Sequence, residues 1–89
     1  MMYPFLQLED GTEIVHSEIL ENGDVRVYIE KPIEGGFQSA FCILPEYRWE
    51  EIHGFSEAEI GGFLDLLESA AHLIIRFARE GGFEGAANF

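Results

Sequence analysis

One long helix near the C-terminus constrains the fold most, because the sequence marks both of its ends. Ser56 followed three residues later by Glu59 forms a capping box, which is typical of a helix N-terminus. The Gly81-Gly82 pair supplies the left-handed conformation that commonly ends a helix. We therefore expect one helix over residues 57–80.

This helix carries more apolar surface than one sheet can cover. At about 100° per residue, its apolar residues fill an arc of roughly 200°, about twice what packing on one sheet face requires. No other part of the chain has a helical pattern that would cover the rest. We therefore expect a homodimer. The alternative is a monomer in which a strongly twisted sheet and the tail wrap around the helix. The candidate dimer interface consists of Phe63, Leu66, Ala70, Leu73 and Phe77.

The first half of the chain predicts antiparallel strands joined by tight turns. Asp-Gly at 10–11 and Asn-Gly at 22–23 separate β-rich runs, and both dipeptides favour type I′ hairpin turns. Residues 25–30 alternate between apolar and mostly polar side chains, which indicates one buried face. Residues 37–44 are apolar on both faces. That pattern predicts a strand covered by the helix on one side and by another subunit on the other.

Together these patterns predict an α+β fold, in which a four-stranded antiparallel β-meander is followed by one long C-terminal helix packed on the sheet. Pro45 should break or bend the fourth strand, and Tyr47 and Trp49 would form a short extension of it. We expect a single domain over residues 1–82 and a flexible C-terminal tail over 83–89.

The charge balance limits the choice of partners. The 89 residues include five Lys and Arg against 17 Asp and Glu, so the formal net charge is −12 at neutral pH. Nucleic-acid binding is disfavoured, because affinity for a phosphate backbone depends on cationic side chains. The acidic surface favours a basic partner protein or mimicry of DNA. The simpler alternative is a solvated exterior that keeps the protein soluble.

No segment of the sequence has the pattern of a signal peptide or a membrane span. The longest apolar run, HLIIRFA, contains Arg76 and is far shorter than a membrane helix requires. We therefore expect a soluble, cytoplasmic protein that does not bind membranes.

The sequence contains no recognisable catalytic or metal-binding motif. Cys42 is the single cysteine, and its apolar strand context indicates a small buried hydrophobe. A nucleophilic role for Cys42 would require a histidine from elsewhere in the fold. His16, His53 and His72 do not have the spacing of a metal site. We expect no cofactor, no metal and no enzymatic activity.

The tripeptide GGF occurs three times, at 35–37, 61–63 and 81–83. The three copies fall in a loop, inside the first turns of the helix and at the helix end. They are therefore neither a repeat nor a phosphate-binding loop. Gly61-Gly62 inside the helix indicates either close approach of a neighbouring backbone, for example from a partner subunit, or a tolerated weakness beside a strong cap.

Tyr47, Arg48 and Trp49 form the candidate interaction site, because aromatic residues and arginine are enriched at binding hot spots. In the alternative interpretation, Tyr47 and Trp49 close one end of the core while Arg48 pairs with a neighbouring glutamate.

The predicted order of four antiparallel strands and one long helix, with FSEAEI at the helix start, resembles at the level of topology the dimeric coactivators that bind single-stranded DNA. The resemblance implies helix-mediated dimerisation and a curved basic sheet. Here the first three predicted strands contain only Arg26 and Lys31 as cations, so the chain departs from that pattern.

From these observations we expect a non-enzymatic homodimer that acts as a protein-interaction or regulatory module. One alternative is a nucleic-acid-related role, through single-strand binding or acidic mimicry of DNA. The other alternative is an enzyme or small-ligand binder with a pocket between sheet and helix.

Overall fold

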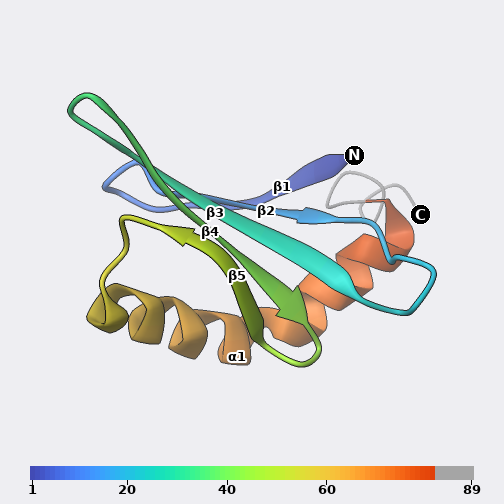
Figure 1. Cartoon of the computed structure of the whole chain (residues 1–89). Coiled ribbons are helices and arrows are strands. Elements are labelled where there is room, and N and C mark those ends of the chain that lie inside the picture. The colour runs from blue at the N-terminus through green and yellow to red at the C-terminus, as the bar shows by residue number, and fades with distance from the viewer. Residues whose placement is uncertain (82–89) are drawn as a thin grey trace.

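The computed structural model describes residues 1–81, which form one antiparallel sheet and one helix (Figure 1). The strands are hydrogen-bonded in chain order, β1-β2-β3-β4-β5. The expected α+β class and the helix bounds are confirmed. The elements are β1 (Met2–Gln7), β2 (Glu13–Ser17), β3 (Val25–Ile33), β4 (Gly36–Leu44), β5 (Arg48–His53) and α1 (Glu57–Glu80).

The sheet has five strands rather than the predicted four. The segment expected to extend the fourth strand is a separate strand, β5, which pairs antiparallel with β4 and places Trp49 opposite Cys42. The chain reverses direction after Pro45, which cannot donate a ladder hydrogen bond, and Tyr47 adopts a φ of 58°. Because of this reversal, residues 48–53 run antiparallel to β4 at the edge of the sheet instead of extending it.

The first two hairpins turn where the sequence predicts, but not as type I′ turns. Only the glycine has a positive φ, 90° at Gly11 and 87° at Gly23. The Asp10 carboxylate instead accepts a hydrogen bond from the Thr12 N–H at 3.0 Å. In the second hairpin, the side-chain oxygen of Asn22 accepts from the Asp24 N–H, also at 3.0 Å. These side-chain bonds favour a three-residue loop that ends in a left-handed glycine.

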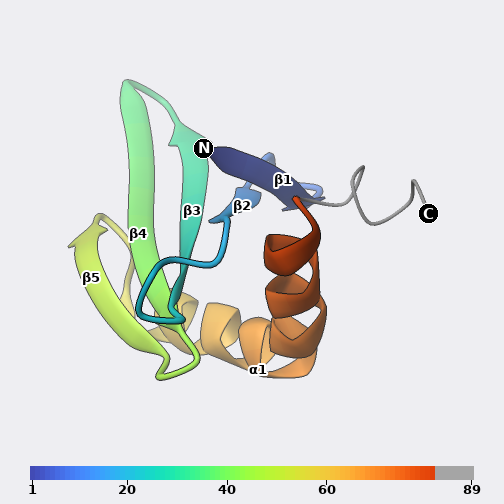
Figure 2. The same cartoon turned by 90° about the vertical axis from the view of Figure 1, so that its right-hand side faces the viewer.

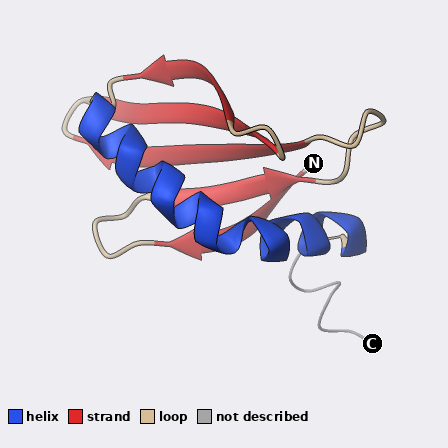
Figure 3. Cartoon of the chain, turned by 90° about the horizontal axis from the view of Figure 1, so that it is seen from below, coloured by secondary structure: helices blue, strands red, loops and turns tan. Residues whose placement is uncertain are grey.

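The hydrophobic core lies between α1 and one face of the sheet, which we call the inner face (Figures 2 and 3). Register places Ile14, Ile29 and Ala40 in one row across β2, β3 and β4, and all three side chains are buried. The helix contributes one stripe of fully or nearly fully buried residues, which we call the buried stripe. Its members are Leu67, Ala71, Ile74 and Ala78.

Both ends of α1 have the caps that the sequence predicts. The Ser56 hydroxyl accepts from the Glu59 N–H at 3.1 Å, and the Glu59 carboxylate accepts from the Ser56 N–H at 3.0 Å. Gly81 has a φ of 81°. The helix changes direction about half-way along its length (Figure 3). Near this point the Ser69 hydroxyl donates to the Leu66 carbonyl at 2.7 Å, a bond that commonly bends helices.

Within residues 1–81, no helix is both long and apolar enough to cross a membrane. The tail predicted at 83–89 lies outside the described residues, so its flexibility and the domain boundary at 82 stay predictions.

Replacing Ser56 by Ala should lower the free energy of unfolding by about 1 kcal/mol, because the Glu59 N–H then loses its capping partner. Urea denaturation followed by circular dichroism measures this loss. Ser69→Ala is the matched control, since it removes a hydroxyl that caps no helix end. Equal losses in the two variants would contradict the assigned role of the cap.

The capping box should also make stability depend on pH. The backbone hydrogen bond from Ser56 is the main cause that lowers the pKa of Glu59 below its ordinary value of 4.5. Because the folded-state pKa is the lower one, this contribution is complete above pH 4.5 and is lost as the pH falls through the folded-state pKa. The urea midpoint of the wild type should therefore exceed that of Glu59→Gln at pH 6, and the difference should shrink as the pH is lowered below 4.5. A gap that stays constant would contradict this linkage.

Candidate functional site

The face of the sheet that points away from α1, which we call the outer face, has no segment of residues 1–81 packed over it (Figure 2). On this face Tyr28 of β3 lies opposite Phe41 of β4, with their ring centroids 4.8 Å apart. The guanidinium of Arg26 lies over the Phe41 ring at 4.4 Å. These three residues and Met2 line a shallow depression of about 230 Å³, the outer hollow.

Arg26 differs from most of the cations in the chain. Lys31, Arg48 and Arg76 each have a carboxylate partner within 4.0 Å. Among residues 1–81, Arg26 and Arg79 have no such ion pair. Arg26 is half-buried, and its stacking on Phe41 leaves the guanidinium edge without an acidic partner.

An acidic row crosses the outer face next to the hollow. Glu13 of β2 lies directly opposite Glu30 of β3, and in the described part of the chain neither has a cation within ion-pair distance. The Tyr28 hydroxyl donates to Glu30 at 2.7 Å. Burial, followed by this contact with Glu30, raises the pKa of Tyr28 above its ordinary value. Like charges directly opposite each other destabilise a sheet, so a cation from outside would relieve this pair.

The structure separates the three residues of the predicted interaction site. Tyr47 and Trp49 are half-buried and pack against the hydrophobic core. Arg48 is exposed and forms ion pairs with Glu46 at 3.0 Å and Glu50 at 3.1 Å. This geometry gives all three residues partners within the chain, and their role in an interface stays a prediction.

The five residues of the predicted dimer interface lie on α1 beside the buried stripe. They are Phe63, Leu66, Ala70, Leu73 and Phe77, which we call the second stripe. Their steps of three, four, three and four residues match the spacing of a helix–helix seam. Phe63 contacts the ring of Phe55 at 4.9 Å, and Phe77 contacts that of Phe5 at 6.1 Å. Leu73 is 37% exposed and the other four are half-buried.

The glycine pair inside the helix is exposed. A Cβ added at Gly61 or Gly62 would have no heavy atom of the described chain within 4 Å. The structure of one chain therefore leaves open space beside both glycines.

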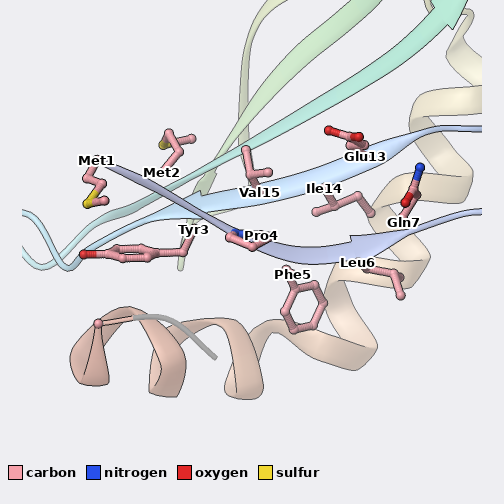
Figure 4. Close-up of a pocket in the computed structure, with 11 residues that line it drawn as sticks. Met1, Met2, Tyr3, Pro4, Phe5, Leu6, Gln7, Glu13, Ile14 and Val15 are labelled. Carbon is pink, nitrogen blue, oxygen red and sulfur yellow. The ribbon is translucent and has the colours of Figure 1, made fainter. Parts of the chain in front are cut away.

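A larger groove follows the free edge of β1 (Figure 4). It has a volume of about 630 Å³ and is lined by residues of β1 and β2, together with Met1 and Gly81. Phe5 points toward the helix, whereas Met2 and Val15 point to the opposite side of the strands. The groove thus runs around a strand edge rather than between sheet and helix.

The reactive side chains of the described residues do not assemble into a metal-binding cluster. No group of three or more His, Cys, Asp or Glu side chains in residues 1–81 is placed to hold a metal ion. His16 is fully buried, and its Nδ1 lies 2.8 Å from the Ser17 carbonyl oxygen. Its Nε2 has no hydrogen-bond partner within the described chain. Cys42 is fully buried in the core, and burial raises the pKa of its thiol to about 11.

The residues of the outer hollow are not recognisable as a candidate site from the sequence. Met2, Arg26, Tyr28 and Phe41 come from β1, β3 and β4, and only strand register brings them together. The sequence gives one indication of this site. Residues 37–44 are apolar on both faces, which predicts that the outer face of that strand is also covered.

Comparisons of the chain with protein-family models, with curated proteins and with solved structures gave no match.

The Cys42 thiol should be unreactive in the folded protein. Its high pKa and complete burial keep it protonated and inaccessible at pH 8. A thiol-specific chromogenic disulfide reagent should label it stoichiometrically in urea but only at the rate of unfolding in buffer. Rapid labelling of the folded protein would contradict this assignment.

Proposed function

We propose that the protein is a non-enzymatic, homodimeric interaction module that receives a basic partner protein on the outer face of its sheet. The observation that carries the proposal is the outer hollow beside the Glu13–Glu30 row, on a face that no segment of residues 1–81 covers.

The outer hollow supports an anchoring role for the outer face. Aromatic residues and arginine provide much of the binding energy at protein interfaces, especially where they form a pocket for one side chain. Here Tyr28 and Phe41 form the walls and Arg26 stacks on one of them. The hollow of about 230 Å³ suits a single apolar side chain of the partner.

The charge next to the hollow supports a basic partner. Glu13 and Glu30 present two adjacent carboxylates without a cation of the described chain. A lysine or arginine of the partner would remove their mutual repulsion. The net charge of −12 would also speed the approach of a basic protein.

The two sheet edges are poorly suited to pairing with another strand. Pro4 lies in the edge strand β1, and the register of β1 shifts between Pro4 and Leu6. The other edge strand, β5, has a second shift, and Glu51 there has a φ of 50°. Proline and bulges are common features of edges that do not recruit further strands. The outer face is therefore the favoured docking surface.

Single-stranded nucleic acid is the second candidate ligand. Stacked aromatic rings with an adjacent arginine on an open sheet can support nucleotide bases. Tyr28, Phe41 and Arg26 have this arrangement, but the Glu13–Glu30 row lies beside them and would repel phosphates. Binding of a labelled oligonucleotide that weakens steeply with salt would favour this candidate over the protein partner.

A pair of short peptides tests the proposed docking surface. N-acetyl-Lys-Phe-Lys-amide should shift the backbone amide NMR signals of residues 26–30 and 39–41, because its ring enters the hollow and its lysines face Glu13 and Glu30. N-acetyl-Glu-Phe-Glu-amide should not shift these signals. Glu30→Gln should weaken the first interaction roughly two- to fivefold, as expected for one exposed charge pair.

Glu68→Gln is the matched control, since it removes the same charge from an exposed position on α1. Shifts spread over the whole acidic surface, or equal weakening by the two substitutions, would contradict docking on the outer face.

A further inference from the structure

The second stripe has the same order of residue types, with nearly the same spacing, in both directions along α1. Ala70 is its centre, leucines lie four residues before it and three after it, and phenylalanines lie seven residues away on each side. A stripe with this symmetry is complementary to a second copy of itself when two helices run antiparallel. The small side chain at the centre allows the helix axes to approach closely.

The dipole of α1 fits the same arrangement. Antiparallel pairing about Ala70 places the first turn of one helix, which carries Glu57 and Glu59, level with the C-terminal end of the other. The two helix dipoles therefore oppose each other in this orientation. Arg79 lies on the opposite side of the helix from the second stripe and takes no part in this contact.

One of the two exposed glycines lies where the partner would pass. At about 100° per residue, Gly62 borders the second stripe, whereas Gly61 lies on the opposite side of the helix. With Ala70 on the symmetry axis, Gly62 lies level with the last turn of the partner's helix. Apart from the helix backbone, no described atom lies within 4 Å of a Cβ added at Gly62, which leaves room for that turn.

We propose that two copies of the chain pair through antiparallel α1 helices, with the two-fold axis at Ala70. Each Leu66 then contacts Leu73 of the partner subunit, and Ala70 meets the partner's Ala70. Phe63 and Phe77 keep their ring contacts within the chain and border the two ends of the interface. The outer faces of both sheets stay free for other partners. The inference rests on the homodimeric part of the proposed function.

Cysteine cross-linking tests this register. Under mild oxidation, Ala70→Cys should form a disulfide-linked dimer roughly tenfold faster than Glu68→Cys, because the axis holds the two introduced thiols at high effective concentration. A mixture of Leu66→Cys and Leu73→Cys chains should form the mixed dimer in preference to either self-linked dimer. The native Cys42 stays buried and does not compete.

Light scattering on the uncross-linked protein separates the possible failures. A mass of 10.1 kDa at all concentrations would overturn both the homodimer and the register. A dimer in which Ala70→Cys links no faster than Glu68→Cys would overturn the register alone.

A pair of substitutions provides a second test that does not depend on oxidation. Leu73→Glu should weaken dimerisation at least roughly tenfold, since it places a charge in the seam. Ile52→Glu is the matched control, because Ile52 is 44% exposed on β5 and lies outside the stripe. Unfolding by urea should confirm that both variants fold. Equal dimer affinities for the two variants would overturn the inference.

Discussion

The packing of the buried stripe of α1 on the inner face of the sheet is the contact on which the rest of the structure depends. Leu67 and Ile74 are fully buried there, in the same core cluster as the row that Ile14, Ile29 and Ala40 form. A five-stranded sheet with no second helix has no other apolar layer among the described residues. The capping box and the left-handed glycine at the two ends of α1 hold this stripe in register with the sheet.

The same contact explains why surfaces remain available for association. A single helix cannot bury all of its apolar surface on one sheet. The second stripe therefore stays partly exposed, although Phe63, Leu66 and Ala70 also pack against the core. The outer face likewise has no layer of the described chain over Tyr28 and Phe41. We infer that the two surfaces have separate roles. In this proposal the helix would pair with a second copy, while the outer face, with Arg26 and the Glu13–Glu30 row, would receive a different protein.

The sequence predicts those parts of the structure that depend on neighbouring residues. Ser56 and Glu59 are three residues apart, so the helix start could be predicted from local chemistry alone. The fifth strand was missed because its strand pattern is short and the chain reversal after Pro45 depends on pairing with β4. The hollow could not be predicted, because Arg26 and Phe41 lie on different strands and meet only through register. The turn types differed because Asp10 and Asn22 bond to the backbone rather than adopting positive φ.

The central claim is that α1 uses one apolar stripe for its own sheet and the other for a second copy of the chain. An isotope-filtered NOE experiment on an equal mixture of labelled and unlabelled protein tests it most directly, because only contacts between chains give signals. We expect intermolecular NOEs between the methyl groups of Leu66 and Leu73, and none from Leu67 or Ile74. Intermolecular NOEs from Tyr28 and Phe41 instead, or none from the second stripe, would contradict it.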